Sequence, residues 1–368
     1  MSLPEHHLDV VYTPGSIEEQ SPRVPLSRVL GAFLLPLFFI LSFTLAYSSA
    51  LNAPKPHDLA LQLAGPSGTT QQIATGIRQQ ASGGFDITRT TSDADAVAAV
   101  RDRSAVGALL IGSGSTPTVT TVIASGGGAL AATTLRQVGA QVADQLHTTA
   151  IVRDVAPLDA DDSTGSGMFY LVLLCTIGGY LTITVLFQAF PTARRRTRIL
   201  VAVGAAVVVP LLVTAATSFS LGILGMDFGQ LAAVLGTEML YTLAVALIAL
   251  VLTEVLGQAA IFAIVLLLMA FNFPSTGGTA PEAMLPPFWQ AIHAVWVGSG
   301  AFEAIRSFVY FGGNGFGWPF ARVLIWLGGT VLTLAAVYLV RQRRASSAAA
   351  PDEHLVTAAA AAPASAIA

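Results

Sequence analysis

Of the 368 residues, 54% are hydrophobic and only 11% are charged, so the chain has too few ionisable side chains to cover a soluble globule of its size. The net charge of −3 supplies no strong field for nucleic acid, and no nucleic-acid partner is expected. Cys175 is the single cysteine, which excludes an intrachain disulfide, and we expect it to be an apolar side chain packed within a helix.

Six apolar blocks predict six membrane-spanning helices, because about 18 or more apolar residues can cross a hydrocarbon layer of roughly 30 Å. The fifth block is short for a span. In chain order the blocks cover residues 29–50, 168–190, 199–224, 229–252, 258–273 and 323–340. The pattern predicts an α-helical integral membrane protein, with the lipid bilayer as its main surroundings and residues 167–341 as a five-helix transmembrane domain.

The two ends of the chain are polar or rich in alanine and are predicted to be disordered. Residues 1–28 contain four prolines and form a predicted cytoplasmic tail, and residues 342–368 form a second one. Arg23 and Arg28 precede the first apolar block, which resembles a secretory signal but is longer than the usual apolar region of one. We therefore interpret residues 29–51 as an uncleaved signal anchor, the first transmembrane helix.

Between the first two spans, residues 52–166 predict a small soluble α/β domain, because strand and helix patterns alternate there. The glycine run 126–128 predicts a flexible turn. The strand patterns lie at 59–63, 106–111 and 119–123, and the helical apolar faces hold Ile73 and Ile77, then Leu135, Val138, Val142 and Leu146.

Arginines at the span ends predict the orientation, since cytoplasmic connections carry an excess of Lys and Arg. Six crossings place three arginine clusters on the cytoplasmic face together with both termini, and the 52–166 domain outside. The clusters are Arg23 with Arg28, then Arg194, Arg195, Arg196 and Arg198, and finally Arg341, Arg343 and Arg344. Only Arg306 and Arg322 fall outside this pattern.

Residues 274–319, between the fifth and sixth spans, predict a re-entrant helical hairpin on the outer side. The segment is rich in aromatic residues, which favour the headgroup level, and its prolines and paired glycines break any full span. Glu303 and Arg306 are three residues apart on a predicted helix, so they can pair with each other. They are either a structural pair or residues that contact a substrate.

Metal and cofactor sites have little support in the sequence. The six histidines lack the spacing of metal ligands, and no Ser, His and Asp grouping favours nucleophilic catalysis. Asp159, Asp161 and Asp162 could bind calcium weakly or form a hydrated hinge before the second span. We therefore expect no cofactor and no enzymatic activity in this chain.

The predicted elements follow in the order of one span, a large external domain and five further spans, with a broken external hairpin before the last span. Within this order stand the runs AYSSALNAPKPHDLALQLAG at 46–65, and PSTGG, LPPFWQAIH and AFEAIRSFVYFGG within 274–313. On this order and these runs, the chain resembles the permease subunit of type-2 ABC exporters, in particular the branch that resembles phage infection protein.

The resemblance implies export of a hydrophobic or amphipathic substrate across a bacterial plasma membrane by a homodimer or heterodimer of permeases. A separate cytoplasmic ATPase would power it, since this chain has no phosphate-binding G-x-x-x-x-G-K-[ST] run. In the family the ATPase contacts an elbow helix and the second connection, which match Ser16–Arg28 and Pro191–Arg198 here. The coupling residues that this implies are Arg194, Arg195, Arg196, Arg198 and Glu254.

The sequence leaves the roles of two carboxylates open, and it allows two rival functions. Glu238 lies inside the fourth span and either lines a substrate or proton path, or is held protonated or bonded to Thr237, Tyr241 or Thr242 across a helix interface. Glu254, at the cytoplasmic boundary, is either solvated or in contact with the ATPase. The rival functions are a non-transporting receptor or secretion accessory, whose external domain binds an envelope or protein partner, and a proton-coupled carrier that uses Glu238.

Overall fold

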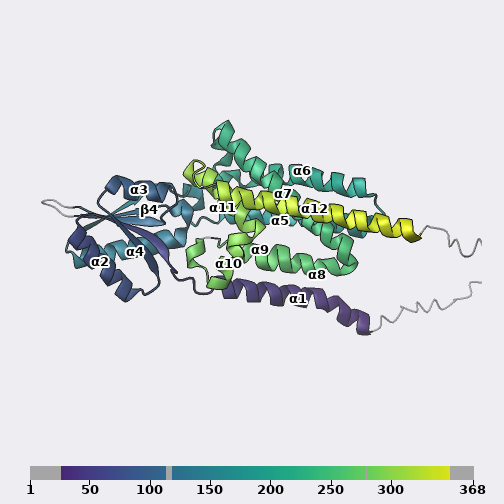
Figure 1. Cartoon of the computed structure of the whole chain (residues 1–368), viewed down its shortest axis with the longest axis horizontal. Coiled ribbons are helices and arrows are strands. Elements are labelled where there is room, and N and C mark those ends of the chain that lie inside the picture. The colour runs from purple at the N-terminus through teal and green to yellow at the C-terminus, as the bar shows by residue number, and fades with distance from the viewer. Residues whose placement is uncertain (1–25, 113–117, 279, 349–368) are drawn as a thin grey trace, which may run out of the picture.

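A computed structural model describes residues 26–112, 118–278 and 280–348 of the chain. This part is mostly helical, and a small five-stranded sheet lies at one end of a set of long helices (Figure 1). Residues 1–25 and 349–368, which hold most of both predicted terminal tails and most of the predicted elbow helix, lie outside the described residues.

Within the described residues, five helical stretches are long and apolar enough to cross a membrane, as a multi-span helical protein requires. Four of them are single helices, and the fifth is the interrupted stretch Phe228–Ser275. The single helices are α1 (Leu26–Leu51), α5 (Gly167–Ala189), α6 (Arg195–Leu221) and α12 (Gly317–Ala348). Because α12 continues to Ala348, the prediction of disorder from residue 342 onward is wrong for residues 342–348.

The stretch Phe228–Ser275 folds back on itself at Gly257, which has a φ of 59°. The amide nitrogen of Asn272 lies 2.8 Å from the hydroxyl oxygen of Tyr241. A straight helix would separate these two residues by about 46 Å, at a rise of roughly 1.5 Å per residue. The elements of the stretch are α7 (Phe228–Leu256), η4 (Gly257–Ala259), α8 (Ala260–Ile264), the π-helix η5 (Val265–Phe271) and α9 (Asn272–Ser275).

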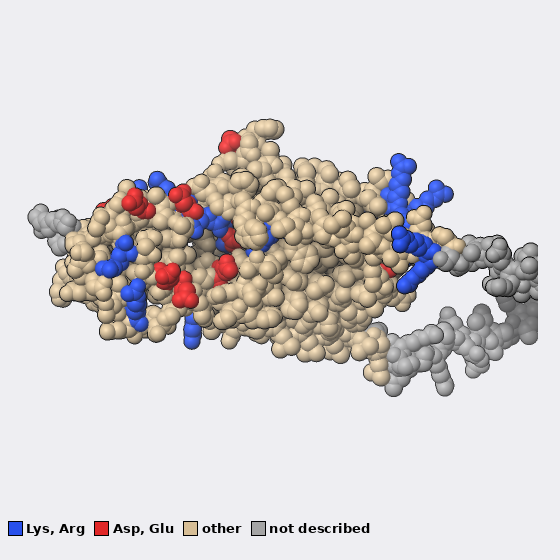
Figure 2. All heavy atoms as spheres, in the orientation of Figure 1, with Lys and Arg blue, Asp and Glu red and all other residues tan. Residues whose placement is uncertain are grey.

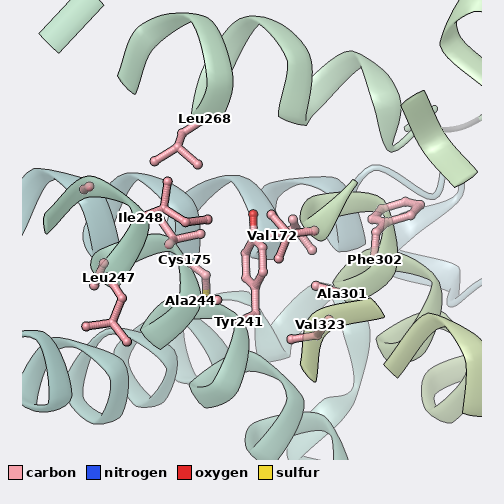
Figure 3. Close-up of a cluster of buried hydrophobic side chains, with 14 of the residues drawn as sticks. Val172, Cys175, Tyr241, Ala244, Leu247, Ile248, Leu268, Ala301, Phe302 and Val323 are labelled. Atoms are coloured by element: carbon pink, nitrogen blue, oxygen red, sulfur yellow. The ribbon is translucent and has the colours of Figure 1, made fainter. Parts of the chain in front are cut away.

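Helix α7 lies at the centre of the helical part and packs against α5, α6 and α12. Tyr241 of α7 is fully buried, and Cys175 of α5 lies beside it in the same apolar cluster (Figure 3). Cys175 is thus the buried apolar side chain that the sequence predicts. The outer faces of α1, α6 and α12 instead expose large apolar side chains such as Leu45, Leu212 and Leu332, which suits contact with lipid.

The soluble domain is a five-stranded sheet in the order β2-β1-β3-β4-β5. Among the strand pairs of the described residues, only β3–β4 is antiparallel, because these two strands follow each other in the chain. In each of the other neighbouring pairs, at least one helix lies between the two strands in the chain, which allows them to run parallel. The strands are β1 (Leu59–Ala64), β2 (Phe85–Thr90), β3 (Gly107–Ile111), β4 (Thr118–Ile123) and β5 (Thr149–Asp154). The three predicted strands are confirmed as β1, β3 and β4, and the sequence did not predict β2 and β5.

Helices cover both faces of the sheet, so the domain has three layers (Figure 1). Helices α2 (Ser67–Gln80) and α4 (Ala129–Gln145) cover the face that holds Leu109, and α3 (Asp93–Arg101) covers the face that holds Leu110. Consecutive strand residues point to opposite faces, which is why neighbouring leucines enter different clusters.

The segment before α12 forms the short helices η6 (Glu282–Met284), α10 (Pro287–Val295) and α11 (Val297–Phe311), and it packs on the soluble domain. The predicted flexible glycine turn is instead the 3₁₀ helix η1 (Ser125–Gly127), and it contacts α11. A Cβ atom on Gly126 would lie 2.4 Å from the Cγ of Tyr310, so only glycine fits this close approach.

The junction of the soluble domain with α5 is built by an aspartate cap. Asp162, at the end of η2 (Ala160–Asp162), is buried and accepts hydrogen bonds from the backbone amides of Ser166 and Gly167. Such a cap satisfies amides that the helix itself cannot pair. The hydrated hinge predicted here is therefore wrong for Asp162. At the C-terminal end of α6, the 3₁₀ helix η3 (Ile223–Gly225) leads into α7.

Candidate functional site

A cavity of about 500 Å³ lies between the soluble domain, the α10–α11 hairpin and the start of α12. Figure 2 shows it as a hollow where basic and acidic side chains meet, on a surface that otherwise carries few charges along the helices. Its polar lining residues are His57, Asp58, Arg103, Glu282, Gln290, His293, Glu303, Arg306 and Arg322. We name this space the junction cavity.

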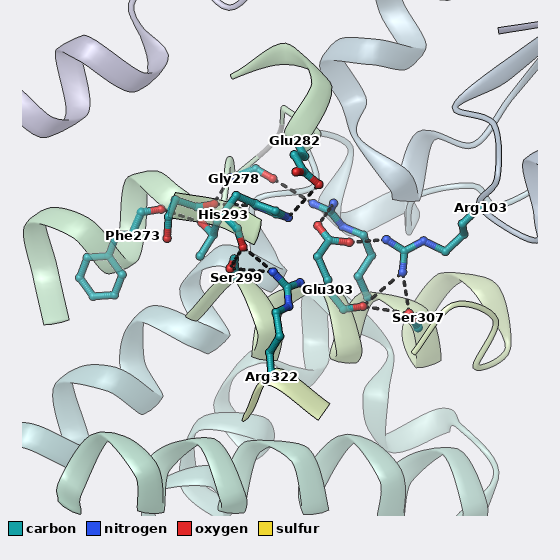
Figure 4. A network of polar contacts seen from close by, with 12 residues as sticks. Arg103, Phe273, Gly278, Glu282, His293, Ser299, Glu303, Ser307 and Arg322 are labelled. Atoms are coloured by element: carbon teal, nitrogen blue, oxygen red, sulfur yellow. Dashed lines mark hydrogen bonds and ion pairs between the residues drawn. The ribbon is translucent and has the colours of Figure 1, made fainter. Parts of the chain in front are cut away.

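Glu303 is the centre of an ion network on the wall of the junction cavity. One carboxylate oxygen lies 2.7 Å from Nη1 of Arg306, so the predicted pair on one helix is confirmed. The other oxygen pairs with Arg103, which lies two residues after the end of α3 and 200 positions earlier in the chain. Nη1 of Arg103 also donates to the hydroxyl of Ser307 at 2.6 Å (Figure 4). The network therefore joins the soluble domain to the hairpin.

The charges around Glu303 keep it ionised. Burial on its own would raise the pKa of this carboxyl, but Arg306 and Arg103 lower the pKa to about 2. Burial lowers the pKa of the Arg306 guanidinium, and Glu303 opposes that effect. At neutral pH the network thus consists of one carboxylate between two guanidiniums.

His293 of α10 is also buried at this wall. Its Nδ1 lies 2.7 Å from the carbonyl oxygen of Ser275, and its Nε2 lies 3.6 Å from a carboxylate oxygen of Glu282. Burial lowers the pKa of His293, while Glu303 and Glu282 act in the opposite direction. The ring is therefore neutral at pH 7, and its Nδ1–H donates to the Ser275 carbonyl, which fixes the tautomer.

Arg322 reaches the junction cavity from the second turn of α12. Its Nη1 donates to the carbonyl oxygen of His293 and lies 3.4 Å from the hydroxyl of Ser299 (Figure 4). The side chain is buried. Within the part of the chain that the structure describes, no carboxylate forms an ion pair with Arg322.

A second ion network lies at the opposite end of the helices, where Glu254 pairs with both Arg198 and Arg341. It ties α6, α7 and α12 together. Glu254 is only 4% exposed, so the prediction that it is solvated is wrong: the two arginines compensate its charge inside the protein.

The other predicted coupling residues lie at the surface of this end. Arg194 and Arg196 are exposed, and Arg195 lies over the ring of Tyr338, 4.5 Å from its centre. Together with Arg343 and Arg344 they form the basic surface at the end farthest from the sheet (Figure 2).

Glu238 lies away from both networks. It is fully buried on α7, and the hydroxyl of Thr214 on α6 donates to its Oε2 at 2.6 Å. The predicted partners on its own helix are wrong, because Thr237 bonds to the Ala233 carbonyl instead and Tyr241 to its neighbours on α5 and α9. Glu238 does not line the junction cavity, so the structure does not bring it together with Glu303 and Arg306.

Sequence reasoning missed Arg103, His293 and Arg322 as members of this site. The one signal that could have pointed to Arg322 is its place outside the cytoplasmic arginine pattern, which it shares with Arg306. Arg103 carries no such signal, because nothing local links it to a residue 200 positions later.

Comparison of the chain with protein-family models, with curated proteins and with solved structures found no match. Its class therefore follows from its own features. These are several apolar helices compatible with a multi-pass membrane protein, a docked α/β domain and a charged cavity between them. Within the described ranges, no group of three or more His, Cys, Asp or Glu side chains is placed to hold a metal ion.

Proposed function

We propose that this chain is the permease subunit of an ATP-driven exporter that moves a hydrophobic or amphipathic substrate outward across a bacterial plasma membrane. In this proposal six helices cross the membrane, because the stretch Phe228–Ser275 turns back at Gly257 and counts as two crossings. Both termini then lie in the cytoplasm, and the soluble domain and the hairpin lie outside. The ATPase is a separate chain.

The observation that carries the proposal is the basic surface at the helix ends farthest from the soluble domain. Arg194, Arg196, Arg343 and Arg344 are exposed there, while Arg198 is held by Glu254. Clustered arginines favour the cytoplasmic side, and exposed ones can contact an acidic surface of an ATPase. The ion network beneath this surface connects it firmly to α6, α7 and α12.

A groove beside α1 supports the class of substrate. It has a volume of about 520 Å³ and lies between α1, η5 and α10, and its lining is almost entirely apolar. The side chains that line it include Phe38, Leu41, Leu45, Phe271 and Trp289. A groove of this composition among apolar helices can hold the apolar part of an amphipathic molecule.

The test starts from native membranes. The full chain, tagged and solubilised, should copurify with an ATPase subunit, and the complex should hydrolyse ATP and drive substrate export in vesicles. The double variant Arg194→Glu/Arg196→Glu should weaken ATPase association. The matched control Arg136→Glu, which reverses an exposed charge on the soluble domain, should not. Absence of an ATPase, or export that continues without ATP, would contradict the proposal.

A second candidate function is a receptor or secretion accessory that does not transport. The junction cavity favours it, because a charged space at the outer domain could bind an envelope component without any passage through the helices. Ligand binding at the cavity in a chain that neither couples to an ATPase nor exports would support this reading. The proton-coupled carrier has less support, since Glu238 lies outside the cavity lining; loss of proton-driven efflux in Glu238→Gln would be its signature.

A further inference from the structure

Arg322 is a buried cation that forms no ion pair with a carboxylate among the described residues. Only 6% of the residue is exposed, and its hydrogen bonds go to the carbonyl of His293 and the hydroxyl of Ser299. Its Nε is buried without a hydrogen-bond partner among the described residues, and its charge interacts with Glu303 and Glu282 only from beyond ion-pair distance. A charged group buried without a partner is costly, and proteins usually pair such a group or use it.

The charges on the inner wall of the junction cavity are unequal. Arg306 and Arg322 are buried, Arg103 is partly buried with 19% of its side chain exposed, and Glu303 is the one buried carboxylate among the described lining residues. Glu282 and Asp58 lie exposed at the rim, where water screens them. The interior of the cavity therefore has an excess of two positive charges.

Two further features point to the same wall. Trp318 and Pro319, in the first turn of α12, line the cavity, so the positive end of a 32-residue helix faces it. Asp58 and Arg103, both lining residues, have positive φ angles of 51° and 65°. Residues other than glycine rarely adopt a positive φ, and those that do often lie at a functional site.

We propose that the junction cavity binds the phosphate monoester of an organic molecule, with Arg322 as its direct ligand. A phosphate monoester carries close to two negative charges at neutral pH, which matches the excess in the cavity. The guanidinium fork of arginine fits phosphate oxygens. Val106, Phe311 and Trp318 supply apolar wall for the organic part, and a volume of about 500 Å³ is far more than a bare phosphate needs.

Two sources can supply this group: a soluble organic phosphate from the outer compartment, or the headgroup of a phosphatidic-acid-type lipid in the outer leaflet. Glycerol 3-phosphate and dihexanoyl phosphatidic acid represent the two sources, because they share the same phosphate monoester and differ in the acyl chains. Dihexanoyl phosphatidylcholine, a diester with no net charge, is the control ligand.

Binding is measured with the purified full chain in a non-ionic detergent, as the shift of Tm with ligand concentration. A ligand that binds only the folded state raises Tm in this way. In Arg322→Gln the affinity for the phosphate monoester should fall by about tenfold to a hundredfold, as for a lost hydrogen bond to a charged group. Without ligand, Arg322→Gln should have an unchanged or higher Tm, because it removes an unpaired buried charge.

Arg136→Gln is the matched control variant, since it removes an exposed positive charge from the soluble domain and should bind as the wild type does. Arg322→Lys keeps the charge without the fork and should bind with intermediate affinity; it also serves if Arg322→Gln does not fold. Binding of both monoesters indicates a site for soluble organic phosphates. Binding of dihexanoyl phosphatidic acid alone indicates a lipid headgroup site.

The proposal is overturned if neither monoester binds, if the phosphatidylcholine control binds equally well, or if binding is unchanged in both Arg322 variants. A lower Tm of ligand-free Arg322→Gln together with unchanged binding would assign Arg322 a purely structural role. The inference does not depend on the exporter proposal. The assay contains no ATPase and no transport step, so its failure would leave that proposal untouched.

Discussion

Replacement of Glu303 by glutamine should weaken the contact between the soluble domain and the hairpin. The substitution keeps the size of the side chain but removes the charge that Arg103 and Arg306 share. Arg306, whose side chain is 4% exposed, is then left buried without a counter-charge. Breaking a buried ion pair from one side typically costs about 3–5 kcal/mol.

The lowered pKa of Glu303 gives a second value for this loss of stability. Its pKa falls from 4.5 to about 2 in the folded protein. This difference corresponds to about 3 kcal/mol of stabilisation. Because the folded pKa is lowered, the stabilisation is complete above pH 4.5 and is lost as the pH falls from 4.5 toward 2. The two routes agree, so about 3 kcal/mol is the expected loss in Glu303→Gln.

Hydrogen exchange of the α11 amides, followed by mass spectrometry on the full chain, measures this loss. About 3 kcal/mol corresponds to roughly a hundredfold faster exchange through local opening. Glu282→Gln, a change on the same hairpin at a side chain that is 51% exposed, is the control and should exchange as the wild type does. The reasoning is refuted if the α11 amides of Glu303→Gln exchange at a rate within a few fold of the wild type. It is also refuted if the protection of these amides in the wild type does not change between pH 4.5 and 2.

Three further predictions test other contacts. Glu254→Gln should lower the stability of the helical part by about 1.5–3 kcal/mol in thermal unfolding, because it removes the buried charge that partly buried Arg198 and exposed Arg341 share, while exposed Arg344→Gln should have no effect. Gly126→Ala should cost about 1–3 kcal/mol by overpacking against Tyr310, and adding Tyr310→Ala should recover part of this loss in the same measurement. Glu303→Gln should bind glycerol 3-phosphate or dihexanoyl phosphatidic acid more tightly in the Tm-shift assay, since it removes the one buried negative charge at the proposed site.

The sequence predicts those parts of the fold that depend on local pattern. Apolar blocks predict helices because hydropathy is a property of the segment itself, and β1, β3 and β4 are found because their residues alternate or are apolar throughout. The missed strands, β2 and β5, are the two edges of the sheet. Nearly all of β5 is exposed, so no buried face imposed an alternating pattern on it.

The same division between local and distant contacts holds in the candidate site. Glu303 and Arg306 were paired correctly because they are three residues apart on one helix. Arg103 and Glu254 depend on partners 200 and 87 positions away, and nothing in their neighbours indicates those partners. A carboxylate at a helix end is expected in water, and only the fold brings Arg341 to Glu254 and excludes the water.

Helix α12 connects the junction cavity to the ion network of Glu254, and this bears on how an exporter of this form could work. Arg322, which lines the junction cavity, and Arg341, which pairs with Glu254, are nineteen residues apart on one helix without an interior break. Their separation along the helix is about 28 Å. A tilt of α12 started at the basic surface would therefore move Arg322 relative to Glu303 and Arg103. If ATPase closure drives export, phosphate affinity at the cavity should differ between the nucleotide-free and ATP-bound complexes. By linkage, the same ligand should change ATP affinity by an equal factor.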